Sequence, residues 1–187
     1  MKIVGTKERG PLGALGAAIG LTAIFACGGG GGSPTTPATT LPPVPAAAVT
    51  ATGEGNLVIH PSVDTRFSFA LETPLRITET TGGTADWNFA RISLFRNGAE
   101  IERNELGSDT IKAAGFGRIG ARSNQLIKVA FRANSDNFDR VDITLGFGDI
   151  KDGRQFTALV PPNSFTDVTI SLTPLSVTPG GVVRPGP

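Results

Sequence analysis

The sequence predicts an all-β protein whose folded part is a single antiparallel β-sandwich. The first observation is a repeated alternation of apolar and polar residues, which is typical of strands with one buried face. The second is a pair of hairpin signals, Asn97-Gly98 and Lys151-Asp152-Gly153, between alternating segments. The third is that no long segment has helical periodicity. Short strands joined by turns, with no helices between them, indicate two packed antiparallel sheets.

The predicted strands follow one another at short intervals. Phe67, Phe69 and Leu71 alternate with Ser68 and Ala70, which predicts a strand with one apolar face. The same alternation recurs at residues 127–133, 141–147, 156–160 and 168–172, and shorter strands are predicted at 57–60, 75–80, 89–96 and 99–102. Asn97-Gly98 joins the last two of these in a tight hairpin, and residues 151–153 join the strands around 141–147 and 156–160.

These strands define one domain from residue 54 to residue 173. Its length of about 120 residues is within the range that folds around a single core. The pattern resembles immunoglobulin-like and fibronectin-like sandwiches, without the cysteine pair of antibody domains. Trp87, near the start of a predicted strand, is expected in the core.

The first 26 residues have the order of a secretory signal peptide. Lys2, Lys7 and Arg9 make the start positive, and no charged residue occurs from Leu12 to Ala26. An apolar run of this length fits the h-region of a signal and is short for a membrane span of about 20 residues. We therefore expect residues 1–26 to be removed as a signal peptide.

Cys27 follows this segment and is the only cysteine of the chain. Ile24-Phe25-Ala26-Cys27 resembles the lipobox of bacterial lipoproteins, although Phe25 departs from the usual residue type at its position. The resemblance implies cleavage before Cys27 and lipidation of its thiol, so that diacylglycerol and a further acyl chain hold the protein on a membrane. A single cysteine also excludes a disulfide within the chain.

The lipoprotein resemblance implies a place in the cell envelope. Gly28 stands where lipoproteins retained on the inner membrane carry Asp, so we expect the outer membrane in a host with two membranes and the outer face of the plasma membrane otherwise. Loss of residues 1–26 removes three of 17 basic and one of 16 acidic residues, so the net charge changes from +1 to −1. A balanced charge gives no electrostatic reason for nucleic-acid binding.

The segments on either side of the predicted domain have the composition of disordered chain. Residues 27–53 are rich in Gly, Pro, Thr and Ala and predict a flexible linker between the lipid and the domain. Residues 174–187 contain Pro179-Gly180-Gly181 and Pro185-Gly186-Pro187 and predict a disordered tail.

A glycine motif suggests an alternative function. Residues Gly115 to Gly120 read Gly-Phe-Gly-Arg-Ile-Gly, which matches G-x-G-x-x-G and resembles the phosphate-binding loop of glyceraldehyde-3-phosphate dehydrogenases. That resemblance implies a helix directly after the glycines and a catalytic cysteine and histidine further along the chain. The alternation from Ile127 predicts a strand there, and Cys27 and His60 both precede the motif. A glycine-rich loop between strands is the favoured interpretation, with nucleotide binding as the alternative.

His60, Ser62 and Asp64 carry the residue types of a hydrolase triad. On an extended strand, residues two apart lie about 6.6 Å from one another, too far for the hydrogen bond of about 3 Å that a nucleophile and its base require. A turn at Pro61 would change this distance, but the favoured interpretation is a surface histidine beside a turn. With one histidine, a site of several histidine ligands is excluded.

Oxygen-bearing side chains gather in one predicted loop, Asn134-Ser135-Asp136-Asn137-Phe138-Asp139, and Asp149 and Asp152 follow one strand later. Such ligands bind calcium in some loops, and they are equally typical of solvated turns. Their spacing does not follow the EF-hand pattern, so we predict no metal site. Carbohydrate binding is disfavoured because Trp87 is the only tryptophan and tyrosine is absent.

Together these observations favour a membrane-anchored envelope lipoprotein whose β-sandwich is a non-enzymatic interaction or structural module, without a cofactor. Its binding surface is expected on an exposed sheet face, on loop tips or at an unpaired edge strand. The expected partner is an envelope protein or glycan. The alternative is an enzyme or nucleotide-binding protein that uses the loop from Gly115 to Gly120 or His60.

Overall fold

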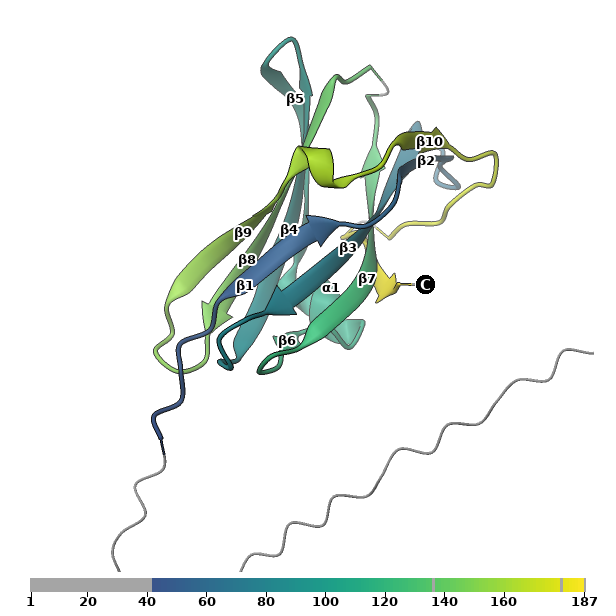
Figure 1. The fold of residues 1–187 in the computed structure, drawn as a ribbon. Coiled ribbons are helices and arrows are strands. Elements are labelled where there is room, and N and C mark those ends of the chain that lie inside the picture. Colours follow the sequence, from purple (N-terminus) through teal and green to yellow (C-terminus); the bar gives the residue numbers. More distant parts are fainter. Residues whose placement is uncertain (1–41, 136, 179, 187) are drawn as a thin grey trace, which may run out of the picture. The chain divides into compact units, whose positions relative to one another are not determined.

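The structure is a computed structural model that describes residues 42–135, 137–178 and 180–186. The predicted signal peptide, Cys27 and the linker up to residue 41 lie outside the described residues. In the described part, two β-sheets enclose a common apolar core (Figure 1), which confirms the predicted all-β sandwich. No helix of this part is long and apolar enough to cross a membrane.

The strands form two sheets of different order. Sheet 1 has the order β10-β2-β3-β7-β11, with β1 also paired to β3, and sheet 2 has the order β5-β4-β8-β9, with β6 beside β4. The strands of sheet 1 are β1 (Val49–Gly53), β2 (Leu57–Pro61), β3 (Phe69–Glu79), β7 (Asn124–Ala133), β10 (Val168–Ile170) and β11 (Val182–Pro185). Those of sheet 2 are β4 (Ala85–Arg96), β5 (Ala99–Gly107), β6 (Arg118–Ile119), β8 (Arg140–Asp149) and β9 (Gln155–Val160). Only β10 and β2 pair in parallel; the other named pairs are antiparallel.

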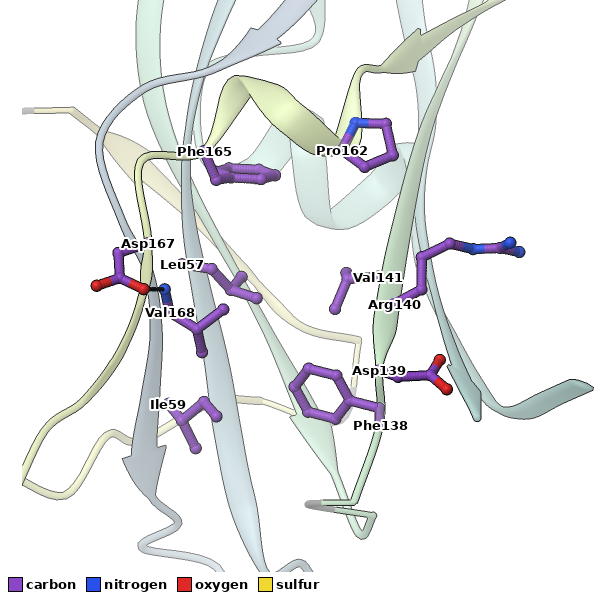
Figure 2. Close-up of a pocket in the computed structure, with 10 residues that line it drawn as sticks. All are labelled: Leu57, Ile59, Phe138, Asp139, Arg140, Val141, Pro162, Phe165, Asp167 and Val168. Carbon is purple, nitrogen blue, oxygen red and sulfur yellow. Dashed lines mark hydrogen bonds between the residues drawn. The ribbon is translucent and has the colours of Figure 1, made fainter. Parts of the chain in front are cut away.

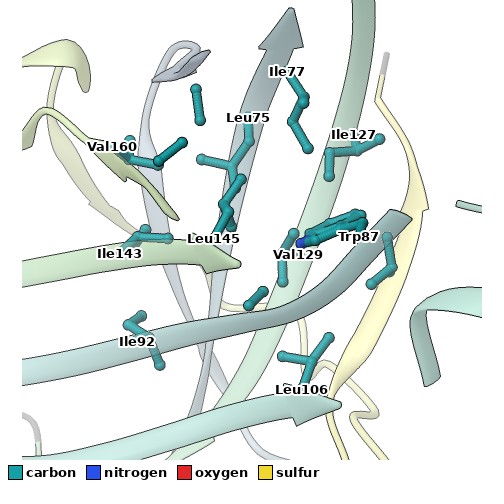
Figure 3. Packing of buried hydrophobic residues seen from close by; sticks show 14 of the residues in the cluster. Leu75, Ile77, Trp87, Ile92, Leu106, Ile127, Val129, Ile143, Leu145 and Val160 are labelled. Atoms are coloured by element: carbon teal, nitrogen blue, oxygen red, sulfur yellow. The ribbon is translucent and has the colours of Figure 1, made fainter. Parts of the chain in front are cut away.

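The core contains the apolar positions of the predicted alternation. Trp87 is fully buried, its Nε1–H donates to the carbonyl oxygen of Phe89 at 2.8 Å, and its ring stacks near that of Phe147 with centroids 6.4 Å apart. The predicted core position of Trp87 is therefore confirmed. Aliphatic side chains of both sheets belong to the same buried cluster (Figure 3): Leu75, Ile77, Ile92, Leu106, Ile127, Val129, Ile143, Leu145 and Val160.

The predicted strands at 67–71 and 75–80 are one long strand, β3, which continues through Pro74. A proline has no N–H to donate, so it interrupts the hydrogen-bonded ladder between a strand and its neighbour. On one side of β3, β2 pairs with Phe69 to Glu72 and β1 pairs with Leu75 to Glu79. Pro74 therefore lies at the change of partner, where the ladder is already broken.

Both predicted hairpins are confirmed. Asn97 and Gly98 have φ values of 51° and 80°, the left-handed conformation that a tight turn between β4 and β5 requires. Gly153, with a φ of 72°, lies in the turn that joins β8 and β9. In addition, the carboxylate of Asp139 accepts the N–H of Asn97 at 2.7 Å. This contact fixes the first hairpin to the segment that precedes β8.

The ordered fold begins earlier than the predicted boundary at residue 54. Residues 49–53, assigned to the linker by composition, form β1, whose alternate residues are buried against β3. Just before β1, the N–H of Ala47 donates to Asp149 at 2.9 Å and that of Ala48 donates to Glu79 at 3.1 Å. Two buried carboxylates thus hold the chain where it enters the domain.

The fold also extends into the predicted tail at residues 174–187. Residues 182–185 form β11, which pairs with β7, and the side chains of Val177 and Val183 are buried. The guanidinium of Arg132 donates to the carbonyl oxygen of Val177 at 2.6 Å, and Arg184 forms an ion pair with the buried Glu72. The C-terminal segment therefore crosses the outer face of sheet 1 and belongs to the domain.

Candidate functional site

The main candidate site is an apolar pocket between β2 and β10 of sheet 1 and the start of β8 in sheet 2. Its volume is about 450 Å³, within the range of ligand sites. Figure 2 shows apolar side chains turned into this space from both sheets and from the segments before β8 and after η1: Leu57, Ile59, Phe138, Val141, Phe165 and Val168. The carboxylates of Asp139 and Asp167 and the guanidinium of Arg140 point away from it.

The pocket exists because β9 is too short to pair with the first residues of β8. The strand β8 starts at Arg140, but β9 pairs with it only from Ile143 onward. After Val160 come Pro161 and Pro162, which cannot donate to a ladder, and the chain turns away through η1 (Pro162–Ser164). At this end of the sandwich the start of β8 lies across the pocket from β2 and β10, but β9 does not extend beside it.

The segment after η1 crosses from sheet 2 to sheet 1. Ser164 accepts the N–H of Gly53 at 2.7 Å, and the N–H of Thr166 donates to the carbonyl oxygen of Gly55 at 2.7 Å. Gly55 has a φ of 75°, so the chain bends between β1 and β2. Gly53 makes room for the crossing segment, because a Cβ there would lie 2.5 Å from the Phe165 ring. As a result, β10 is placed beside β2 as the edge strand of sheet 1 (Figure 1).

The strand β10 and the two residues after it are unusually exposed for an apolar segment. Val168 is 51% exposed, Ile170 75% and Leu172 91%. A second pocket of about 430 Å³ lies beside Ile170 and Leu172 and shares Ile59 with the first. We call the two pockets together the β10 groove, bordered by Leu57, Ile59, Phe69, Val168, Ile170 and Leu172.

Charged groups stand around the groove and not inside it. The carboxylate of Asp167 accepts the N–H of Val168 at 2.7 Å. Arg140 is paired with Asp142 at 3.1 Å, and its guanidinium lies 3.9 Å from the centroid of the Phe95 ring. Near the first pocket, the carboxylates of Asp139 and Asp167 therefore carry negative charge without an ion pair to any side chain among the described residues.

The residues His60, Ser62 and Asp64 do not come together as a triad. The ring Nδ1 of His60 lies 3.1 Å from the carbonyl oxygen of Thr173, a contact in which the ring donates. The hydroxyl of Ser62 forms hydrogen bonds with the backbone of Asp64. Hydrogen bonds from the side chain and backbone of Arg66, with further attraction from Arg132, lower the pKa of Asp64 to about 2. The three side chains thus make separate local contacts and do not form a triad, and the Nε2 atom of His60 is buried without a hydrogen-bond partner among the described residues.

The loop from Gly115 to Gly120 is bound to a preceding helix, α1 (Ser108–Ala113), instead of opening a following one. The backbone N–H groups at the start of the loop are already used: those of Ala114, Gly115 and Phe116 donate to the carbonyl oxygens of Thr110, Lys112 and Ile111 at 3.2, 2.9 and 3.1 Å. The loop therefore closes the C-terminal end of a helix and leads into β6, so the helix N-terminus that would face a pyrophosphate does not follow it.

The oxygen-rich loop is likewise engaged in local contacts. The N–H groups of Asn134 and Ser135 donate to the carboxylate of Glu102 at 3.0 Å. Asp149 accepts N–H groups from Ala47 and Lys151, which lowers the pKa of its carboxyl even though burial opposes this. Among the residues that the structure describes, no group of three His, Cys, Asp or Glu side chains is placed to hold a metal ion. Asp136 lies outside the described residues.

Sequence reasoning did not find the β10 groove. The alternation at 168–172 predicted a strand with one apolar face, and that strand exists in shorter form as β10. It did not indicate that this face would lack a cover. Cys27, the predicted lipidation site, lies outside the described residues.

Comparisons with known proteins identify no family. No protein-family model and no curated protein matches the chain. Among solved structures, the chain is similar to the CARDB domain of a Pyrococcus furiosus protein, determined in complex with di-metal ions. The identity is 10% and the TM-score 0.30, with 65% of this chain and 90% of that chain covered. The assignment of the sandwich therefore rests on the strands and sheets described above.

Proposed function

We propose that this chain is a membrane-anchored envelope lipoprotein whose β-sandwich is a non-enzymatic binding module. The observation that carries the binding part is the β10 groove, because exposed apolar surface beside an unpaired strand edge is typical of interaction sites. The engagement of His60, Ser62, Asp64 and the glycine loop in structural hydrogen bonds supports a binding role over the enzymatic alternative. The partner is a component of the same envelope.

The anchoring part of the proposal is supported by the lipobox-like sequence that ends in Cys27. Diacylglycerol and an amide-linked acyl chain would hold the protein firmly, since each buried methylene contributes about 0.8 kcal/mol. The Gly- and Pro-rich segment from Gly28 to residue 41 then separates the lipid from the domain. In a host with two membranes, the proposed location is the outer membrane.

Metabolic labelling with a radioactive fatty acid tests the anchor. We expect the wild-type protein to be labelled and to fractionate with membranes, because Cys27 supplies the thiol that accepts the lipid. Cys27→Ala is expected to lose the label and to keep the signal peptide uncleaved. Serine at the same position is a second variant without a thiol and should behave like alanine. Equal labelling of the wild type and both variants would exclude a lipid on Cys27.

Crosslinking in intact cells tests the binding part. The anchored protein is expected to form discrete adducts with an envelope component. Gly117→Ala should leave these adducts unchanged, because Gly117 lies outside both pockets of the β10 groove. His60 lines the second pocket, so His60→Ala is not a control for the groove. Loss of the adducts in Gly117→Ala, in a protein that remains folded, would favour the enzymatic alternative.

A further inference from the structure

We propose that the β10 groove accepts an extended polypeptide segment of a partner, which pairs with β10 as an added strand. The inference rests on the proposed function of the sandwich as a binding module, and it names the chemistry of the ligand. The ligand has apolar side chains at alternating positions and basic residues near its ends. The backbone, the side chains and the surrounding charges of the groove each favour such a ligand.

The backbone of β10 has its free hydrogen-bonding groups on the open side. The carbonyl oxygen of Asp167 accepts the N–H of Leu57 at 2.9 Å, and the N–H of Ser171 donates to Ile59 at 2.8 Å. In a strand, alternate residues direct both backbone groups to the same neighbour. Asp167, Thr169 and Ser171 therefore face β2, and the N–H and carbonyl groups of Ile170 face the open edge.

This edge lacks the charged residues and proline that often prevent strand pairing, although β10 is only three residues long. The edge strand β5 carries Glu100, Arg103 and Glu105, and the edge strand β11 carries Arg184 and Pro185. Charges and proline at an edge discourage the addition of another chain. The strand β10 reads Val-Thr-Ile, without a charge or a proline. It is thus open to a further strand in a way that β5 and β11 are not.

The side chains of the groove favour a ligand with apolar residues at every second position. Val168, Ile170 and Leu172 share one face of their segment, since strand side chains alternate. That face continues over Ile59 into the two pockets, which an added strand would cover with its own apolar side chains. An acyl chain would fill the same apolar space but would leave the N–H and carbonyl groups of Ile170 unpaired, so a polypeptide is the better match.

The charges near the groove favour basic residues at the ends of the ligand. Asp139 and Asp167 lie on opposite sides of the first pocket, one before β8 and the other before β10. Arg140, the first residue of β8 and the neighbour of Asp139 in sequence, is paired with Asp142 at 3.1 Å. Because both carboxylates are exposed and point out of the first pocket, lysine or arginine near the ends of the ligand would meet them at the rim of the groove and not inside it.

A synthetic peptide tests the proposal on the full chain in lipid nanodiscs. The probe has about nine residues, with valine at alternating positions, threonine between them and lysine at both ends. We expect saturable binding by fluorescence anisotropy. A probe methylated on alternate backbone nitrogens keeps the side chains but loses N–H donors, and we expect it to bind about tenfold more weakly. Replacing the terminal lysines by glutamate should also weaken binding, and more so at low salt.

Two matched variants locate the binding surface. Ile170→Lys places a charge on the proposed edge at a residue that is 75% exposed, and we expect at least a tenfold loss of peptide affinity. Leu159→Lys makes the same change on β9 at a residue that is 59% exposed and outside the groove, and we expect no loss. Equal thermal midpoints of the two variants would show that both are folded.

Several outcomes would overturn the proposal. Equal binding of the methylated probe would exclude strand pairing, and displacement of the probe by a fatty acid would indicate an acyl-chain site. If the wild-type protein self-associates and Ile170→Lys abolishes this self-association, the occupant of the edge is a second copy of the chain. If envelope adducts persist in Ile170→Lys while the peptide fails to bind, the proposed binding function is supported but the proposed strand pairing at β10 is contradicted. If the wild type forms no envelope adduct at all, the proposed function itself falls.

Discussion

Removal of residues 174–187 is expected to lower the free energy of unfolding by about 3–5 kcal/mol. The segment buries Val177 and Val183, and full burial of one such side chain contributes about 1.5–3 kcal/mol. Its loss also leaves Arg132 without the carbonyl of Val177 and Glu72 without Arg184. Equilibrium unfolding in urea, followed by Trp87 fluorescence, measures the change.

Two single substitutions separate this effect from a general effect of truncation. Val183→Ala removes buried methyl groups and is expected to cost about 1–2 kcal/mol. Leu172→Ala changes a side chain that is 91% exposed and should cost less than about 0.5 kcal/mol. A truncated protein as stable as the wild type would contradict the place of the C-terminal segment in the fold and would restore the predicted disordered tail.

Glu79→Gln is expected to destabilise the protein by about 2 kcal/mol at neutral pH, because the buried carboxylate joins three parts of the chain. It accepts backbone N–H groups from Ala48, Thr81, Gly82 and Arg122 at 2.8–3.1 Å, and the hydroxyl of Thr81 at 2.6 Å. An amide at this position has one acceptor oxygen, so some of these donors lose their partner. Thermal and urea unfolding at pH 7 measure the loss.

The same carboxylate predicts a pH dependence. Burial alone would raise the pKa of Glu79, but the hydrogen bonds from Thr81, Arg122, Ala48 and Gly82 outweigh it and lower the pKa from 4.5 to about 2. A carboxyl with a lower pKa in the folded state stabilises the fold above its unfolded pKa and loses this effect on acidification. The stability difference between wild type and Glu79→Gln should therefore be constant above about pH 5 and shrink towards pH 2.

Glu105→Gln is the matched control for this substitution. Glu105 pairs with Arg91 on the surface, where both side chains are well exposed, and such pairs contribute about 0–1 kcal/mol. A difference between Glu79→Gln and wild type that stays the same from pH 7 to pH 2 would contradict the assigned role of Glu79.

Alternation predicted the central strands well because their apolar faces are buried on a common core. Ile127, Val129 and Phe131 in β7 and Leu145 and Phe147 in β8 are all buried as the pattern requires. Turn chemistry was equally reliable, since Asn97-Gly98 reaches a conformation that few other residue pairs adopt. These parts of the fold depend on local signals that a single sequence carries.

The terminal strands escaped prediction because they bury small or isolated apolar residues. In β1 the inward positions are Val49, Ala51 and Gly53, which differ little from a flexible linker in composition. The strand β11 places one buried residue, Val183, among residues next to proline and glycine. Their order comes from contacts distant in sequence, such as Ala47 with Asp149 and β11 with β7, which local composition does not report.

The sequence predicts the apolar face of the β10 groove but not its exposure. The sequence indicates that Val168, Ile170 and Leu172 share a face, and it suggests an unpaired edge as one possible binding surface. Whether that face is covered depends on the opposite sheet. Here Pro161 and Pro162 end β9 early, so a residue pattern that elsewhere produces a buried face leaves an open one.

Site-specific photocrosslinking in the native envelope tests the binding module most directly. A photoreactive residue at position 170 is expected to give a discrete adduct that the lysine-ended peptide suppresses, whereas one at position 159, also exposed but outside the groove, should give none. Equal adducts at both positions, or an adduct at position 170 that the peptide leaves unchanged, would contradict binding through the β10 groove.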